Sequence, residues 1–172
     1  MFWKNLHQHK NSDTNLNLSL TKKTDPAVLH LFEDILNSDS NLRVKVTGRS
    51  MSPFLRGEEI LTIKRVPYTS LRRGDLILFK NHLGYPVLHR IIKKKQDQDD
   101  VVTFQTKGDA MIVFDEPVRN NKILGKVCKI EDGSKYINME TKMWSRINYM
   151  AAVISLLESR LYFALKAFKN LF

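Results

Sequence analysis

The chain has 172 residues, which suits one domain with appended segments and is too short for two full enzyme domains. Hydrophobic residues make up 42% of the chain, so a packed core can form and global disorder is excluded. Lysine and arginine outnumber aspartate and glutamate by 28 to 18, and the net charge of +10 favours an anionic partner, either nucleic acid or a membrane surface. The single cysteine, Cys128, excludes an internal disulfide framework and a zinc-ribbon site.

The N-terminal part divides into a polar arm and a helix. Residues 1–23 are polar and show no periodicity, so we expect a flexible arm, and they lack the apolar segment of a signal peptide. An amphipathic helix and linker are predicted over residues 24–41, because Asp25 and Pro26 form a typical helix start. The apolar residues at helical spacing are Val28, Leu31, Phe32, Ile35 and Leu36.

Residues 42–139 are predicted to form a compact, mainly antiparallel β domain. Short runs rich in Val, Ile, Leu and Phe alternate there with Gly, Pro, Asp and Asn, which is typical of strands joined by tight turns. The expected strands are Arg43–Thr47, Glu59–Arg65, Asp75–Lys80, Pro86–Lys93, Val101–Lys107 and Lys122–Ile130, with Lys135–Met139 as a candidate for a further short strand. The charged segment Lys93–Asp100 is expected to be a solvent-exposed hairpin tip.

Residues 140–172 are predicted to form a basic amphipathic helix. Apolar residues recur there at steps of three or four, as Trp144, Ile147, Ala151, Ile154, Leu157 and Leu161. The longest uncharged apolar stretch, Ile147–Leu157, is shorter than the roughly 20 residues that span a bilayer. Residues Trp144–Leu157 are expected to pack on the β domain, while for Leu161–Phe172 packing on the domain, pairing with another chain and contact with an anionic membrane surface stay open. We therefore expect a cytoplasmic protein that is, in the last case, peripheral at the membrane.

Three segments contain residues typical of a catalytic site. Ser50 lies in the run Gly48–Pro53, and a serine at a strand-to-turn junction can present its hydroxyl beside a backbone N–H, as a nucleophile requires. His89 lies inside an apolar strand, and a neutral imidazole can accept the serine proton. Asp109 and Asp115 follow, and either carboxylate could orient that imidazole. The alternatives are a plain turn, a core histidine and ordinary loop carboxylates.

The same segments resemble the ordered boxes of type I signal peptidases. GRSMSP, RRGDLILF, VLHRII, TKGDAMIVFD and ILGKV occur in the family's order between Val44 and Val127. Bacterial leader peptidases and the self-cleaving SOS repressors carry lysine before the arginine, whereas this chain has His89 before Arg90, as in the endoplasmic reticulum, archaeal and sporulation branch. The resemblance implies a signal-peptidase-like β fold.

The resemblance also implies the chemistry. Ser50 would be the nucleophile of peptide hydrolysis and His89 the general base, with Asp109 and Asp115 as orienting or stabilising acids. The substrate would be a peptide or precursor protein bound as an extended strand, with no metal or organic cofactor. Members of this branch are commonly anchored by a helix ahead of the serine, but here that helix is short and contains Glu33.

Two other functions are weighed against a serine peptidase. The first is a non-catalytic peptide-binding module on the same fold. The second is a self-cleaving transcriptional regulator, which the positive charge suggests. Such a regulator needs a helix-turn-helix, and the residues before Leu42 contain only one convincing helix, so nucleic acid is not the expected partner.

Overall fold

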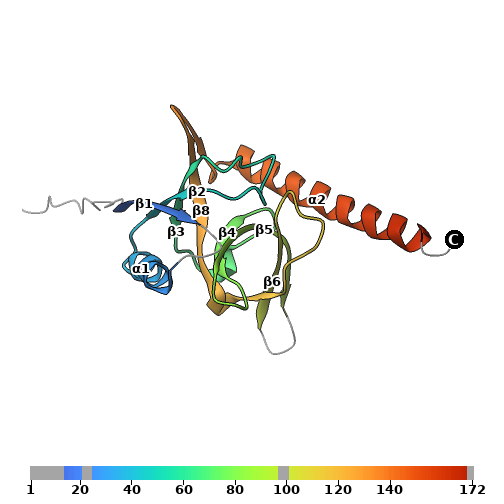
Figure 1. Ribbon diagram of the computed structural model, residues 1–172, viewed down its shortest axis with the longest axis horizontal. Helices are drawn as coiled ribbons and strands as arrows, with labels where there is room; N and C mark the ends of the chain where they lie inside the picture. Colours follow the sequence, from blue (N-terminus) through green and yellow to red (C-terminus); the bar gives the residue numbers. More distant parts are fainter. Residues whose placement is uncertain (1–13, 21–24, 97–100, 170–172) are drawn as a thin grey trace, which may run out of the picture.

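The computed structural model describes residues 14–20, 25–96 and 101–169, which form one nine-stranded sheet and two main helices (Figure 1). Helix α1 comprises Pro26–Asn37 and helix α2 comprises Lys142–Lys169. The strands are β1 (Thr14–Leu20), β2 (Leu42–Val46), β3 (Ile60–Lys64), β4 (Leu76–Lys80), β5 (Pro86–Gln96), β6 (Val102–Lys107), β7 (Val118–Arg119), β8 (Ile123–Asp132) and β9 (Lys135–Asn138). Short 3₁₀ turns occur at Tyr68–Ser70 and Asn120–Lys122.

The strand order is β1-β2-β3-β8-β4-β5-β6-β7, with β9 added to β8, so the sheet is an open path and not a closed barrel. All pairs are antiparallel except β1 with β2, which is parallel. The predicted mainly antiparallel β domain between an N-terminal and a C-terminal helix is therefore confirmed. Strand β5 continues three residues further than expected, to Gln96, and residues 97–100 of the predicted hairpin tip lie outside the described residues.

The prediction of a flexible arm over residues 1–23 is wrong for residues 14–20, which form a strand. Thr14–Leu20 forms strand β1 and pairs with β2, while residues 1–13 and 21–23 lie outside the described residues. The sequence TNLNLSL alternates leucine with polar residues, which is a strand pattern. The two-residue strand β7 was also absent from the prediction, because so short a run has no periodicity to detect.

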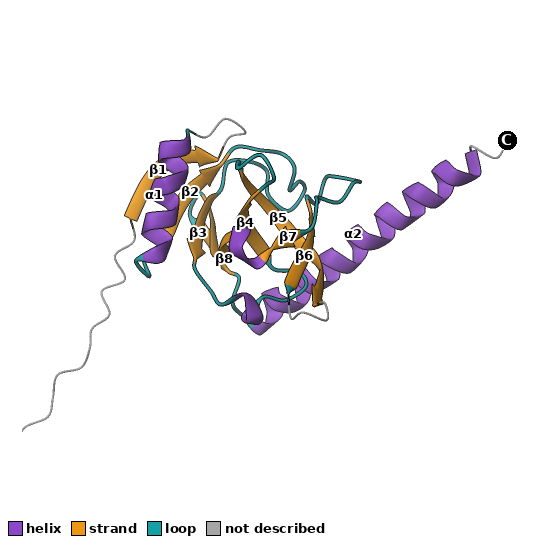
Figure 2. Cartoon of the chain, turned by 90° about the horizontal axis from the view of Figure 1, so that it is seen from below, coloured by secondary structure: helices purple, strands orange, loops and turns teal. Residues whose placement is uncertain are grey.

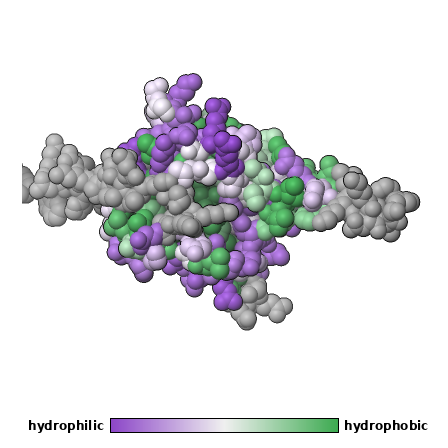
Figure 3. Space-filling view, in the orientation of Figure 1, coloured by the Kyte–Doolittle hydropathy of each residue, from purple (hydrophilic) through white to green (hydrophobic). Residues whose placement is uncertain are grey.

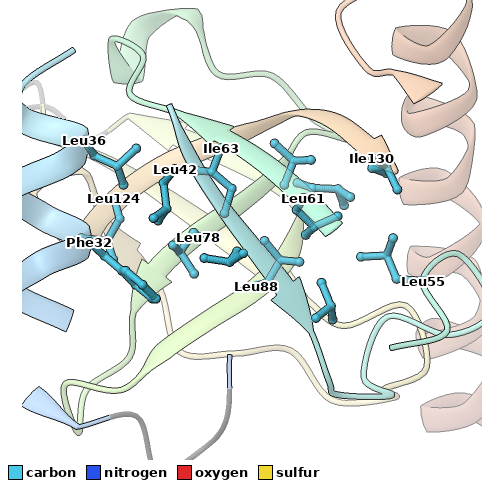
Figure 4. Packing of buried hydrophobic residues seen from close by; sticks show 14 of the residues in the cluster. Phe32, Leu36, Leu42, Leu55, Leu61, Ile63, Leu78, Leu88, Leu124 and Ile130 are labelled. Atoms are coloured by element: carbon cyan, nitrogen blue, oxygen red, sulfur yellow. The ribbon is translucent and has the colours of Figure 1, made fainter. Parts of the chain in front are cut away.

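The main core lies between α1 and the sheet. The α1 residues Phe32, Ile35 and Leu36 are buried against Leu42 of β2 and Leu78 of β4, among others (Figure 4). Asp25 caps the helix by accepting a hydrogen bond from the Ala27 N–H at 2.8 Å, and Pro26 opens it, as predicted. A second cluster, which includes Ile77, Phe79, Ile91 and Phe104, fills the other face of β4 and β5.

Helix α2 crosses the sheet region and then extends away from it (Figures 1 and 2). Among the α2 residues whose side chains the structure describes, the buried ones are Asn148, Ala152, Ser155 and Ser159, which are small or polar. The predicted packing of the apolar residues holds for Trp144, which is half-buried against the core, but is wrong for Ile147, Ile154 and Leu157, which are exposed. Within the residues that the structure describes, neither helix combines the length and the apolar character needed to cross a membrane.

Phe32→Ala is expected to lower the free energy of unfolding by about 3–5 kcal/mol, because Phe32 is fully buried and its removal leaves a cavity under α1. Urea denaturation measures the change. Leu31→Ala on the same helix is the control, since Leu31 is 40% exposed and should cost under about 1 kcal/mol. Equal losses for the two variants would contradict this packing.

Candidate active site

The His89 ring is bound by a carboxylate at one of its two nitrogens. The Nδ1 atom of His89 lies 2.7 Å from Oδ2 of Asp115, and the His89 side chain is 10% exposed. The same Asp115 oxygen accepts a hydrogen bond from Thr106 Oγ1 at 2.7 Å. An ionised Asp115 can only accept, so Nδ1 carries the proton and Nε2 is the basic nitrogen. This fixes the tautomer that a general base needs.

Strands β5 and β6 position this pair. Register in the antiparallel ladder places Ile91 opposite Thr106, two residues beyond His89 along β5. The chain after β6 then turns back, so that the Asp115 N–H donates to the Thr106 carbonyl at 3.0 Å. The Gln105 side-chain amide donates to the Asp115 carbonyl. Asp115 is thereby held against β6 from both its backbone and its side chain.

The backbone of Ser50 lies near the other ring nitrogen of His89, across Gly108. A Cβ placed at Gly108 would lie 2.6 Å from the Ser50 carbonyl oxygen and 2.9 Å from His89 Nε2. Both groups therefore approach the same point, and only glycine leaves room for them. The Ala110 N–H donates to the Ser50 carbonyl at 2.8 Å and ties the serine turn to the loop after β6. The structure thus brings Ser50, His89 and Asp115 together.

The Ser50 hydroxyl makes no hydrogen bond to the His89 ring within the described part of the chain. The side chain of Ser50 is partly exposed, and a serine hydroxyl rotates freely about χ1 where it is not held. Catalytic hydrogen bonds are often long before substrate binds, so this geometry is compatible with a nucleophile and base that meet in the complex. The Ser50 backbone N–H likewise donates to no group among the described residues.

Asp109 has a different role from Asp115. Its two carboxylate oxygens accept from Nε and Nη2 of Arg90 at 2.8 and 2.6 Å, so the pair is bidentate. Asp109 makes no contact with the His89 ring in any described interaction. Of the two candidate acids, Asp115 is therefore the one placed to orient the imidazole, and Asp109 holds the loop by pairing with arginine.

Arg90 joins four separate parts of the chain. It is fully buried, and its Nη1 donates to the Gly74 carbonyl at 3.0 Å and to Asn148 Oδ1 of α2 at 2.9 Å. The guanidinium carbon lies 4.6 Å from the centre of the Phe54 ring, which follows the Ser50 turn. Since His89 and Arg90 point to opposite faces of β5, the arginine fixes the strand while the histidine faces the candidate site.

Lys107 is a second buried cation beside Arg90. Its Nζ donates to the Met111 carbonyl at 2.5 Å and so closes the turn that follows β6. Burial lowers the pKa of Lys107, while the nearby carboxylates of Glu158 and Asp109 act in the opposite direction. The buried Lys107 side chain therefore stabilises the loop between Gly108 and Asp115 by donating to a carbonyl of that loop.

A pocket of about 490 Å³ opens beside His89 and Asp115. Phe79, Val87 and Val118 supply apolar parts of its wall. Strand β6 pairs with β5 only from Arg90 to Gln96, so residues 86–89 have no strand partner on that side within the described chain. These residues are buried or half-buried, so the feature is an unpaired stretch of strand beside the pocket, and strand addition to such a stretch is one way in which extended peptides bind.

The loop between β2 and β3, which contains Ser50, is held at its far end by Glu59. The Glu59 carboxylate accepts hydrogen bonds from the backbone N–H groups of Arg56, Gly57 and Glu58 at 2.7, 2.9 and 3.0 Å. Burial raises the pKa of Glu59, but these hydrogen bonds outweigh it, and the net pKa lies below the ordinary value for glutamate. An ionised Glu59 therefore stabilises the folded loop.

Several residues of this site were not found by sequence reasoning. Thr106 was seen only as part of a motif, and Asn148 lies in the distant helix α2, so nothing in the sequence links it to Arg90. The described residues contain no group of three His, Cys, Asp or Glu side chains that could hold a metal ion. A scan of the chain against models of protein families finds no match.

Glu59→Gln is expected to destabilise the fold at neutral pH by about 2 kcal/mol, because a neutral amide accepts backbone hydrogen bonds more weakly than a carboxylate. The folded pKa is lowered, so the contribution of Glu59 is present above the unfolded pKa and is lost as pH falls through the folded pKa. Urea denaturation from pH 7 down to pH 3 should show the difference from wild type shrinking. Glu58→Gln, with a 79% exposed side chain, is the control and should change little.

Gly108→Ala is expected to displace the Ser50 turn or the His89 ring, because the added methyl group has no room between them. Nitrogen-proton correlation spectra of the histidine rings should show shifted His89 resonances. Gly48→Ala is the matched control, since a Cβ at Gly48 meets nothing within 4 Å and should leave those resonances in place. Unchanged His89 resonances in a folded Gly108→Ala protein would contradict the close approach.

Proposed function

We propose that this protein is a serine endopeptidase of the signal peptidase type, with Ser50 as nucleophile, His89 as general base and Asp115 as the residue that orients His89. The proposal rests on the surroundings of the His89 ring, because Asp115 lies on its Nδ1 side and the Ser50 turn lies beside its Nε2 atom. An imidazole held in this tautomer between a carboxylate and a serine is the arrangement used for acyl transfer to a hydroxyl.

In the proposed reaction, Ser50 Oγ attacks the carbonyl carbon of the scissile peptide bond while His89 Nε2 accepts the hydroxyl proton. The tetrahedral intermediate collapses, the C–N bond breaks, and the imidazolium returns that proton to the departing amine. A water molecule then attacks the acyl-enzyme with His89 again as base, and release of the carboxylic acid product restores Ser50. Asp115 stabilises the imidazolium in both halves without taking its proton.

The backbone N–H of Ser50 is our candidate oxyanion donor. It donates to no other group among the described residues and belongs to the same residue as the nucleophile, so it can point at the developing oxyanion. A donor of this kind is worth about 10²–10³ in rate. The hydrogen bond from the Ala110 N–H to the Ser50 carbonyl supports the role of oxyanion donor, because it fixes the orientation of the turn that contains the Ser50 N–H.

The proposed substrate is a peptide or precursor protein bound as an extended strand. The stretch of β5 at residues 86–89 that has no strand partner opposite β4 supports this, because a substrate strand could form backbone hydrogen bonds there, up to and including His89. The adjoining pocket could then accept a substrate side chain against Phe79 and Val87. The sequence resemblance to signal peptidases of the histidine branch supports the same mode of binding.

The proposed location is the cytoplasm, at or near the inner face of the membrane. The surplus of ten positive charges supports contact with the anionic cytoplasmic leaflet.

Ser50→Ala is expected to abolish covalent labelling by a tagged fluorophosphonate and to abolish cleavage of a mixed peptide library, both followed by mass spectrometry. His89→Ala should slow labelling by about 10²–10⁴-fold through loss of the general base. Asp115→Asn should also slow labelling strongly, because an amide can favour the wrong ring tautomer. Asp109→Asn is the matched control. If circular dichroism shows that it is folded, fluorophosphonate should label its Ser50 at about the wild-type rate, because Asp109 does not contact the His89 ring.

Two outcomes would contradict the peptidase proposal. A folded His89→Ala protein with full activity would exclude the imidazole as base. Failure of wild-type Ser50 to react with the fluorophosphonate, together with tight binding of uncleaved library peptides, would favour the non-catalytic peptide-binding module instead.

A further inference from the structure

The surface of α2 carries a row of exposed apolar side chains. Its members follow one another at steps of four and three residues, which places them on one face of the helix. The row consists of Met143, Ile147, Met150, Ile154, Leu157 and Leu161, and each is at least 39% exposed. Figure 3 shows hydrophobic side chains on the part of α2 that extends beyond the β domain.

The opposite face of α2 is the one that packs on the domain. It carries Asn148, Ala152, Ser155 and Ser159, all buried, with Ser159 Oγ donating to the Ile112 carbonyl at 2.9 Å. Apart from Trp144, which is half-buried against the core, the helix therefore packs on the domain mainly through small and polar side chains and exposes the large apolar side chains of the row, the reverse of an ordinary surface helix. An apolar face of this extent is typical of a surface that binds a protein partner or a membrane.

Cations gather beside the N-terminal end of this row. Arg72, Arg73, Lys142 and Arg146 line a shallow hollow of about 650 Å³ together with Tyr149 and Met150, and no carboxylate lines it. The Arg73 guanidinium lies 5.4 Å from the centre of the Tyr149 ring, and its buried Nε has no hydrogen-bond partner in the described chain. Four cations without a carboxylate form a surface complementary to phosphate or another anionic group.

Two partners could cover the row, a second copy of this chain or a lipid bilayer, and their charges distinguish them. A second copy of the chain would bring together two molecules that each carry a net charge of +10, and it would supply no anionic group for the cluster of Arg72, Arg73, Lys142 and Arg146 from its own α2 row. Glu158 is the only acidic residue in the α2 sequence, so the helix offers little to offset that repulsion. An anionic bilayer matches both features at once, with an apolar interior for the row and phosphates for the cations.

We propose that α2 binds the surface of an anionic lipid bilayer, with the apolar row at the level where headgroups meet acyl chains and Arg72, Arg73, Lys142 and Arg146 on lipid phosphates. The helix lies in the plane of the membrane and does not cross it. Because Asn148 and Ser159 of the same helix contact Arg90 and the loop before Asp115, the candidate active site would then be held near the bilayer. The binding itself does not depend on peptidase activity.

The test is co-sedimentation of the full chain with vesicles of phosphatidylcholine, with and without phosphatidylserine. Binding should require phosphatidylserine and weaken as salt is raised. Ile154→Ser combined with Leu157→Ser should weaken binding roughly tenfold or more, since both side chains are exposed and their loss leaves the fold intact. Arg72→Gln, Arg73→Gln and Arg146→Gln combined should weaken it roughly a hundredfold, at about fivefold for each charge.

Two controls make the result specific. Lys93→Gln, Lys95→Gln and Lys135→Gln combined remove three exposed positive charges that lie outside the cationic hollow, and this variant should keep most of the binding. Leu83→Ser removes an exposed apolar side chain outside α2 and should also keep most of the binding. Ser50→Ala should bind vesicles as wild type does, so failure of the peptidase proposal and failure of this one are separate results. Equal binding to both vesicle types, or equal losses in the α2 and control variants, would overturn the proposal. The proposal would also be overturned if the wild-type chain sedimented as a dimer that does not bind vesicles, and if Ile154→Ser with Leu157→Ser converted that dimer to a monomer.

Discussion

The buried Arg90 side chain is the interaction on which the rest of the candidate site depends. A cation without exposure to water must find acceptors in the protein, and Arg90 finds them in Asp109, in the Gly74 turn and in Asn148 of α2. Removing one partner from a buried charge of this kind costs about 3–5 kcal/mol. The arginine therefore forces a loop, a turn and a distant helix to meet behind β5, and the neighbouring His89 takes its position from that strand.

The two carboxylates near β6 show how position decides function for one residue type. Asp109 follows the strand directly and its side chain lies on the Arg90 face, whereas Asp115 returns along β6 and reaches the His89 face. Thr106 contributes a hydroxyl that holds Asp115 in line with the ring. A single strand thus separates a structural ion pair from a candidate catalytic pair, so the protein can keep Arg90 neutralised without drawing Asp115 away from the imidazole.

Much of this arrangement was accessible from the sequence. Alternation and turn residues located β2 to β6 and β8 closely, because local hydrophobic patterns and glycine or proline turns determine those elements. Motif order and the family resemblance predicted a grouping of Ser50 and His89 with a carboxylate that could be either Asp109 or Asp115. The separation of Asp109 from Asp115 could not be predicted, because it depends on how the chain turns after Gly108. The contact of Asn148 with Arg90 joins residues 58 positions apart, and β1 was missed although TNLNLSL alternates.

The packing of α2 has a consequence for where the molecule can be cut. Sequence patterns divide the chain at residues 139 and 140, yet Asn148 and Ser159 lie beyond that division and contact Arg90 and Ile112 before it. A fragment that stops at the end of the strands would leave a guanidinium hydrogen and the Ile112 carbonyl without their protein acceptor and donor. We therefore expect a stable unit to include the first five turns of the helix as well as the sheet, and truncations for crystallisation or expression should end after Ser159.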